Sequence, residues 1–117
     1  YEIIAWRNSG NPFSDLWFKS DLGSTDKHAN TLVGTDLNLD GYLDIFSGSG
    51  LRDENPELLL WLGNANPFSG VWDLQEMGDL GETVPGAVAA DMDGDGDQDI
   101  VVASASMIII WENQALP

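Results

Sequence analysis

The chain has 117 residues, of which 43% are hydrophobic, so it is about the size of one small domain that can bury a core. Its 20 acidic residues against 4 lysines and arginines give a formal charge of -16, which excludes nucleic acid and anionic membranes as expected partners. There is no cysteine to form a disulfide framework, and the apolar runs are far shorter than the roughly 20 residues that span a bilayer, so membrane insertion is not expected.

Short apolar or alternating runs, separated by Gly, Asn, Asp and Pro, predict an all-β chain, and no stretch has a convincing helical periodicity. Because the runs are mostly apolar, we expect strands that are buried on both faces, as in stacked sheets. In chain order the predicted strands are residues 2–8, 16–22, 30–36, 43–49, 57–63, 71–77, 86–91, 99–104 and 107–113.

The sequence repeats itself at an offset of 55 residues. TDLNLDGYLDIFSGS from Thr35 aligns with ADMDGDGDQDIVVAS from Ala90, which gives the offset as 90 minus 35. The same offset places WRNSGNPFSDLW from Trp6 on WLGNANPFSGVW from Trp61 without a gap. IIIWEN near the end of the chain begins a third copy of the second motif. A repeat of this length is typical of arrays that stack one unit on the next.

We therefore predict one domain, residues 1–117, built from two repeats of about residues 1–57 and 58–117. Each repeat offers four strands, so two four-stranded antiparallel sheets are expected. By this match the chain opens with the last two strands of one set, continues through one complete set and closes with the first three strands of another. The chain is thus expected to begin and end within a sheet and to leave apolar edges and faces open, which proteins normally cover or pair.

Each repeat carries an acidic loop of nine residues, and the second, DMDGDGDQD, holds more like charge than a folded loop normally tolerates without a cation. Side chains at positions 1, 3, 5 and 9 can converge on one centre, with a carbonyl from position 7 and a glycine turn at position 6. Six or seven oxygen ligands suit Ca²⁺ better than Mg²⁺. The sequence thus predicts two Ca²⁺ sites, with ligands Asp36, Asn38, Asp40, Tyr42 (carbonyl) and Asp44, and Asp91, Asp93, Asp95, Asp97 (carbonyl) and Asp99.

Two other interpretations of these loops are weaker. A lone Asp-Gly pair is common in hairpin turns, but here the whole pattern recurs at a fixed offset between strands. An EF-hand needs a bidentate Glu at position 12 and flanking helices, whereas that position holds Ser47 or Val102 inside predicted strands.

ADMDGDGDQDIVVAS followed by IIIWEN resembles the FG-GAP or VCBS type of repeat, to which the integrin-alpha-like repeats belong, and the resemblance covers nearly the whole chain. It implies two tandem four-stranded β-propeller-type blades with DxDxDGxxD calcium loops, and an extracellular or cell-surface location. The first loop departs from the pattern at Asn38 and Leu39, which is expected to weaken its site. Since a closed propeller needs about 4 to 8 blades, two blades imply either a fragment or an assembly of copies.

The five tryptophans recur at two positions of the repeat. Packing between sheets is one explanation, and stacking on sugars, as in some propeller lectins, is the other, because an indole suits half-exposed sites. The nearby Asn8, Asn64 and Asn113 can orient sugar hydroxyls or cap turns. The candidate ligand-binding residues are Trp6, Trp17, Trp61, Trp72 and Trp111.

Catalysis has little support in the sequence. His28 is the only histidine, no serine lies in a nucleophile-elbow context, and the polar cluster of Asp26, Lys27 and His28 is more typical of a loop. We expect a non-catalytic, calcium-stabilised extracellular structural or adhesion module that assembles with copies of itself head to tail, as a ring or a filament. The alternatives are a carbohydrate-binding module with glycans as partners and a fragment excised from a larger propeller protein.

Overall fold

The computed structural model describes residues 1–11, 13, 17–50 and 56–115, so the first NPFS turn lies partly outside the described residues. Within these ranges the chain forms nine strands, and no helix there is long and apolar enough to cross a membrane. The nine predicted strands are confirmed, with ends that agree to within two residues. They are β1 (Glu2–Asn8), β2 (Trp17–Ser24), β3 (Ala29–Thr35), β4 (Asp44–Ser49), β5 (Leu58–Leu62), β6 (Asp73–Gly78), β7 (Gly86–Ala90), β8 (Asp99–Ala103) and β9 (Ile108–Trp111).

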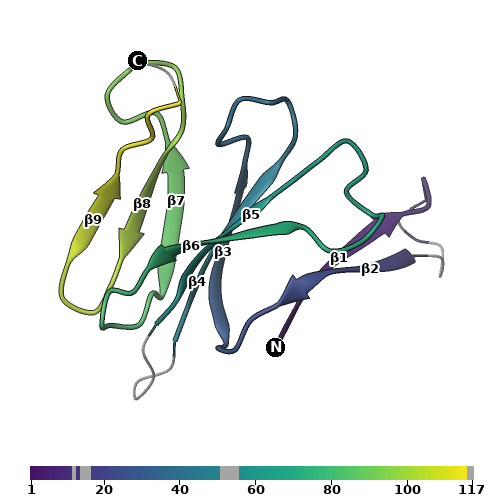
Figure 1. Cartoon of the computed structure of the whole chain (residues 1–117), viewed down its shortest axis with the longest axis horizontal. Coiled ribbons are helices and arrows are strands. Elements are labelled where there is room, and N and C mark those ends of the chain that lie inside the picture. Colours follow the sequence, from purple (N-terminus) through teal and green to yellow (C-terminus); the bar gives the residue numbers. More distant parts are fainter. Residues whose placement is uncertain (12, 14–16, 51–55, 116–117) are drawn as a thin grey trace.

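The strands form three antiparallel sheets, which stand in a row in chain order (Figure 1). These are a two-stranded sheet (β1-β2), a four-stranded sheet (β3-β4-β5-β6) and a three-stranded sheet (β7-β8-β9). The prediction of two complete four-stranded sheets is therefore wrong. The all-β architecture is confirmed, and so is the expectation that the chain opens with the last two strands of one set, continues through a complete set of four and closes with the first three of another. Because β5 pairs with β4 and β6 pairs with β5, the four-stranded sheet spans the boundary between the two sequence repeats at residues 57 and 58.

The strand registers repeat at the offset found in the sequence. Val33 pairs with Phe46 in the four-stranded sheet, and Val88 pairs with Val101 in the three-stranded sheet. The β1-β2 pair repeats the β5-β6 pair in the same way, and both pairs change register at equivalent positions, between Ile3 and Ile4 and between Leu58 and Leu59. The sequence repeat is thus also a repeat of backbone pairing.

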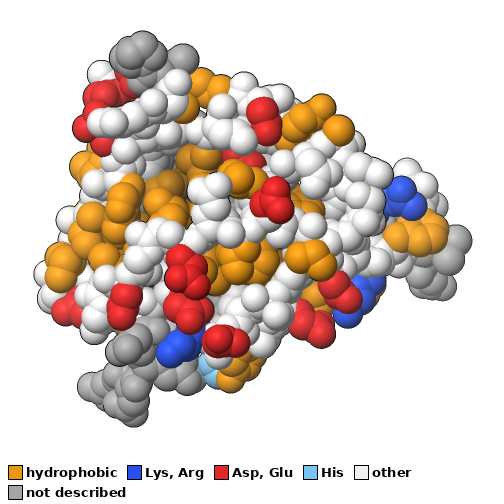
Figure 2. Space-filling model, in the orientation of Figure 1, with side chains coloured by type: hydrophobic (Ala, Val, Ile, Leu, Met, Phe, Trp, Pro, Cys, Tyr) orange, Lys and Arg blue, Asp and Glu red, His pale blue; other side chains and the backbone are white. Residues whose placement is uncertain are grey.

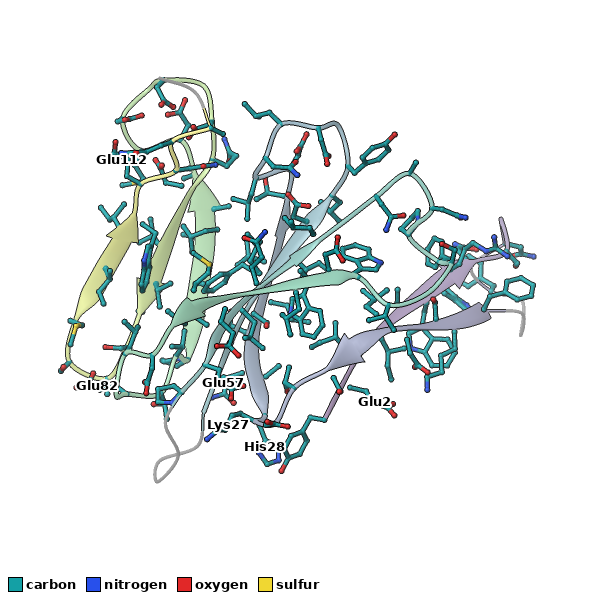
Figure 3. All side chains as sticks on the ribbon, viewed as in Figure 1. Glu2, Lys27, His28, Glu57, Glu82 and Glu112 are labelled. Carbon is teal, nitrogen blue, oxygen red and sulfur yellow. The ribbon has the colours of Figure 1, made fainter. Side chains whose placement is uncertain are left out.

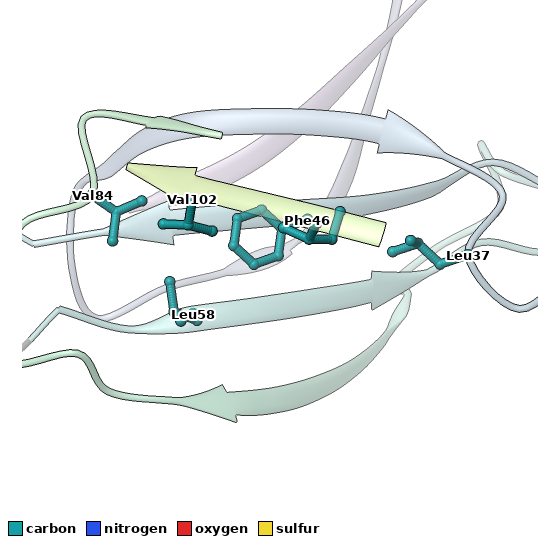
Figure 4. Packing of buried hydrophobic residues seen from close by; sticks show 6 residues of the cluster. Leu37, Phe46, Leu58, Val84 and Val102 are labelled. Atoms are coloured by element: carbon teal, nitrogen blue, oxygen red, sulfur yellow. The ribbon is translucent and has the colours of Figure 1, made fainter. Parts of the chain in front are cut away.

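One core cluster lies between the four-stranded and three-stranded sheets. It joins Leu37, Phe46 and Leu58 to Val102 of β8 and to Val84, which precedes β7 (Figure 4). Paired residues of antiparallel strands share a face, so Val33, Phe46 and Leu60 point to the three-stranded sheet together.

A second core cluster lies between the two-stranded and four-stranded sheets, around Trp61. The Trp61 side chain is 1% exposed, and its indole Nε1–H donates to the Ser47 hydroxyl over 2.9 Å. Gly23 of β2 lies against this ring, since a Cβ atom there would be 2.3 Å from the indole. Ile3 and Leu22 complete the contact from the two-stranded sheet.

Candidate metal loops

The two acidic loops lie at the same end of the molecule, at the top of Figure 1. Residues 36–44 connect β3 to β4 and residues 91–99 connect β7 to β8, so each loop joins the first two strands of its sheet. Both loops end on an aspartate that already belongs to the next strand. Strand pairing therefore fixes both ends of each loop.

The two loops share one pattern of hydrogen bonds from backbone N–H groups to side chains. In each loop the side chain at position 1 accepts a hydrogen bond from the backbone N–H of position 6, and the side chain at position 3 accepts one from the N–H of position 5. The side chain at position 5 accepts from the N–H of position 7, and the side chain at position 9 accepts from the N–H of position 2. Each carboxylate has about four lone-pair sites, so these bonds leave oxygen lone pairs available to a cation. The pattern arranges the side chains that the sequence proposed as ligands at positions 1, 3, 5 and 9.

The backbone has the left-handed conformation at positions 4 and 6 of both loops. Position 6 is Gly41 with φ 89° or Gly96 with φ 103°. Position 4 is Gly94 with φ 84° in the second loop but Leu39 with φ 60° in the first. A non-glycine residue in this conformation costs roughly 1–2 kcal/mol, so the first loop adopts the same turn with added strain.

The aspartates at position 9 also hold the strands together. Asp44 accepts from the N–H groups of Leu37 (2.9 Å) and Gly63 (2.8 Å), one on each carboxylate oxygen. Asp99 is 1% exposed and accepts from Met92 (2.8 Å) and from the residue equivalent to Gly63, Asn113 (2.8 Å). Each aspartate thus ties the start of its loop to the end of the third strand.

In the second loop the carboxylates converge. One oxygen from each of Asp91, Asp93 and Asp99 lies within 4.8 Å of the others. Oxygens that share a Ca²⁺ at 2.3 to 2.6 Å are at most about 5 Å apart, so this donor set fits the ion. Among the described residues, the three aspartates of the first loop form no such group. Instead, the amide of Asn38 donates to Asp40 over 3.0 Å.

The carboxylate at position 3 of the second loop has a perturbed pKa. The backbone N–H of Asp95 lowers the pKa of Asp93, but partial desolvation and the negative charges of Asp95, Asp99 and Asp91 outweigh it and raise the pKa above its ordinary value. Like charges held this close disfavour ionisation, and a cation between them reverses the effect.

The residues at position 7, proposed as carbonyl ligands, differ in their side chains. Tyr42 is exposed, whereas Asp97 is fully buried. The Asp97 carbonyl lies 3.4 Å from the amide nitrogen of Gln98, a long contact that leaves a lone pair available. The backbone N–H of each residue donates to the carboxylate at position 5.

Asn113 links the two loops, a role that the sequence analysis did not assign. Its side-chain amide donates to the carbonyl of Leu37 in the first loop (2.7 Å) and to that of Gln98 in the second (3.1 Å). Its position two residues after Trp111, where the other repeat has Gly63, was the available signal. At Gly63 a Cβ atom would lie 2.0 Å from a backbone oxygen, so that position requires glycine.

The asparagines near the tryptophans cap turns. Asn8, Asn64 and Asn113 each accept a hydrogen bond from the N–H two residues later. This confirms the second of the two roles considered for them. It leaves the amide of Asn113 free to bridge the loops, as described above.

The structure separates the five tryptophans. Trp61 and Trp72 are buried together in the second core cluster, where the indole of Trp72 donates to the Pro67 carbonyl over 3.0 Å. Trp6 and Trp17 are exposed and lie near the same end of the β1-β2 ladder, where Trp6 pairs with Lys19 and Trp17 pairs with Asn8. Trp111 is half-buried and lines a cleft of about 650 Å³ between the four-stranded and three-stranded sheets.

That cleft combines an apolar floor with amide side chains. Leu60, Met77 and Ile100 form apolar parts of its lining, and Gln75 and Gln98 supply polar groups. Its volume lies within the range of about 300–1,000 Å³ that is usual for small-molecule sites.

The polar cluster of Asp26, Lys27 and His28 lies at the end of the molecule opposite to the acidic loops (Figure 3). The His28 ring stacks on Tyr1, with 3.8 Å between ring centroids. Another acidic residue at this end, Glu82, accepts hydrogen bonds from both serine hydroxyls of the β8–β9 turn, Ser104 and Ser106, each over 2.7 Å. The His28 ring and the Glu82 carboxylate therefore each have a local contact.

Comparison with known proteins gives one match. A family model described as an FG-GAP-like repeat matches residues 36–102, which is 67 of the 117 residues and includes both acidic loops. No curated protein and no solved structure matches the chain significantly.

Proposed function

The chain belongs to the FG-GAP-like repeat family, and from this premise we propose that it is a non-catalytic, calcium-stabilised structural or adhesion module of the extracellular space, which assembles head to tail with copies of itself. The observation that carries the calcium assignment is the convergence of Asp91, Asp93 and Asp99 within 4.8 Å. The hydrogen bonds that the first loop shares with the second support a weaker site there.

The extracellular location is supported by the chemistry of the proposed sites. Exposed loops that hold Ca²⁺ in extracellular modules typically bind it with dissociation constants of about 10⁻⁴ to 10⁻³ M, so they fill where calcium is millimolar. Two bound ions would also offset +4 of the formal charge of -16. The assembly is supported by large hydrophobic side chains that stay exposed on the first and last sheets of the row, such as Trp6 and Ile108.

The non-catalytic assignment rests on where the reactive groups lie. The single histidine stacks on Tyr1, far from the acidic loops, and the chain has no cysteine. Among the described residues, the one group of three converging carboxylates is the group assigned to the cation.

Thermal unfolding in millimolar calcium and in a chelator tests the calcium assignment. At about 1 to 10 times its dissociation constant, an ion that binds only the folded chain adds about 0.4–1.4 kcal/mol per site, which raises the melting temperature of a domain of this size by about 2–6 °C. Magnesium at the same concentration serves as the control and should have a smaller effect, because it retains its water shell. Identical melting curves in calcium and chelator would refute the assignment.

A second candidate function, carbohydrate binding, is favoured by the cleft at Trp111. An indole beside amide groups can stack on a sugar ring while Gln75 and Gln98 bond its hydroxyls. Titration of Trp fluorescence with a panel of neutral mono- and disaccharides tests it. A saturable change that Trp111→Ala abolishes, while Trp6→Ala preserves it, would support sugar binding, and no change across the panel would reject it.

A further inference from the structure

The row of three sheets ends in two exposed faces. On the three-stranded sheet the face is apolar: Val88, Ile108 and Ile110 point away from the core, and Ile108 and Ile110 are 76% and 52% exposed. On the two-stranded sheet, Ile4 and Trp6 point away from the core together with their paired residues Asp21 and Lys19, which form an ion pair, and Trp6 is 56% exposed. Figure 2 shows hydrophobic side chains gathered over the region of β8 and β9. We call these surfaces the β7–β9 outer face and the β1–β2 outer face.

The repeat identifies what each outer face corresponds to inside the molecule. The β7–β9 outer face is equivalent to the face of the four-stranded sheet that packs on the three-stranded sheet. This follows from the matched registers of the two sheets. The residues equivalent to Val88, Ile108 and Ile110 are Val33, Leu58 and Leu60, and all three belong to the core cluster between those sheets.

The β1–β2 outer face is equivalent to the other face of the four-stranded sheet, which packs on the two-stranded sheet. Ile4 and Trp6 are equivalent to Leu59 and Trp61 of the four-stranded sheet, which are buried against the two-stranded sheet. Trp111 of the three-stranded sheet is the third member of this set, and it packs toward the four-stranded sheet. The tryptophan-bearing face of one sheet therefore packs, at both junctions within the chain, on the face of the preceding sheet that carries Leu58 or its equivalent.

The two outer faces are thus the two halves of a junction that the chain already makes twice. We propose that a second copy of this chain covers them, with the β1–β2 outer face of one copy packing on the β7–β9 outer face of another. The inference deepens the proposed head-to-tail assembly and rests on it. It assigns the contact to sheet faces rather than to strand edges, both of which the sequence predicts to be open.

The geometry makes this contact heterologous. The two faces are different surfaces, so each copy can use both at once, and the chains close into a ring only if the rotation between copies permits it. A two-stranded sheet is wide enough for such a junction, since its inner face already buries Trp61 to 1% exposure.

The contact should be weak, and this sets the concentrations for the test. Strands of seven and eight residues give the β1–β2 outer face a footprint of roughly 230 Å², from a rise of about 3.3 Å per residue and two strands about 4.8 Å apart. This is far below the roughly 800 Å² per partner of a standard interface. The association should therefore depend on concentration between about 10 μM and about 1 mM.

Complementation between two variants tests the proposal by sedimentation velocity in millimolar calcium. Ile110→Asp disables only the β7–β9 outer face, and Trp6→Asp disables only the β1–β2 outer face. Each variant alone should be a monomer at concentrations where the wild-type chain associates, with an association constant reduced by about 10-fold or more. An equimolar mixture should form a 1:1 dimer, because each variant keeps the face that the other has lost.

The control variant is Val71→Asp, which changes a side chain that is 77% exposed in the β5–β6 connection, on neither outer face. It should associate as the wild type does. Calcium-dependent melting of every variant shows that it is folded, and Ile108→Asp replaces Ile110→Asp if the latter is not.

Three results would overturn the proposal, and a fourth would reject only the calcium assignment. Assembly that survives both substitutions, or variants that fail to complement, would reject the two faces but leave head-to-tail assembly in place. A wild-type chain that binds calcium and stays monomeric up to about 1 mM would reject the assembly and the faces together, and another partner would then cover them. An unchanged melting curve in chelator would reject calcium alone.

Discussion

Replacing Asp99 by alanine should destabilise the chain even in the absence of calcium. This buried carboxylate accepts two backbone hydrogen bonds of 2.8 Å, from Met92 and Asn113. Hydrogen bonds to charged groups contribute about 1.5–3 kcal/mol each, so their loss should cost about 3–6 kcal/mol. At roughly 0.05–0.15 kcal/mol per residue, the whole chain has a free energy of unfolding of about 6–18 kcal/mol. Asp99→Ala should therefore remove a large fraction of it.

The matched variant is Asp93→Ala, in the same loop. Asp93 is exposed, and it accepts one backbone hydrogen bond in an exposed turn, from Asp95 over 3.2 Å. In chelator its removal should leave stability unchanged or slightly raised, because a carboxylate repelled by its neighbours is lost. In calcium it should lose most of the stabilisation contributed by the ion.

Urea unfolding followed by Trp fluorescence gives the free energy of unfolding of the wild type and of both variants, with calcium and with chelator. We expect Asp99→Ala to lower this free energy in both conditions, and Asp93→Ala to lower it only in calcium. Asp99→Asn, which keeps one acceptor oxygen, should fall between the wild type and the alanine variant. If Asp99→Ala lost less than about 1 kcal/mol in chelator, its two hydrogen bonds would not be holding the strands, and the role assigned to it would be wrong.

Three further predictions concern single contacts. Asn113→Ala should lower the free energy of unfolding in urea by about 1–3 kcal/mol, because both loops lose a hydrogen-bond donor. Calorimetry should also show weaker calcium binding by the first loop. The control Asn64→Ala removes a turn cap and should lower the free energy of unfolding less. Leu39→Gly should stabilise the chain by about 0.5–1 kcal/mol, since relief of left-handed strain exceeds the entropy that glycine adds to the unfolded state, and a loss would contradict the strain argument. Hydrogen bonds from Ser106 and then Ser104 lower the pKa of Glu82 below its ordinary value of 4.5, so its stabilisation is present above that pH and is lost as the pH falls through the lower folded value. Glu82→Gln should thus melt below the wild type at pH 7, and the difference should shrink as the pH falls below 4.5.

The strands could be predicted from the sequence because their apolar runs are short and bounded by turn residues. The make-up of the sheets could be predicted in part, because matching the strands to the repeat gives two, then four, then three strands, as observed. The division into residues 1–57 and 58–117 did not predict the sheets, because a sequence period marks equivalent residues but not which strands pair, and β5 pairs with β4 across that division.

The convergence of Asp91, Asp93 and Asp99 could also be predicted, since odd spacing brings these side chains to one centre, although Asp95 is not part of that group. The double role of Asp44 and Asp99 could not, because it depends on partners that come about 14 to 19 residues later. The bridge from Asn113 to Leu37 spans 76 residues and exists only because two sheets pack side by side. Contacts of that range depend on packing between sheets, on which a local motif carries no information.

The two loops share a hydrogen-bond pattern but differ in the donors that they offer to a cation. The contacts between the loops indicate how the two proposed sites would act together. The first loop has an amide at position 3 and a strained leucine at position 4, and its aspartates do not converge. The second has neither defect, and its Asp99 fixes the backbone of Asn113. The amide of Asn113 then holds the first loop through the Leu37 carbonyl. A cation in the second loop would therefore also order the first, so the weaker site should fill only after the stronger one.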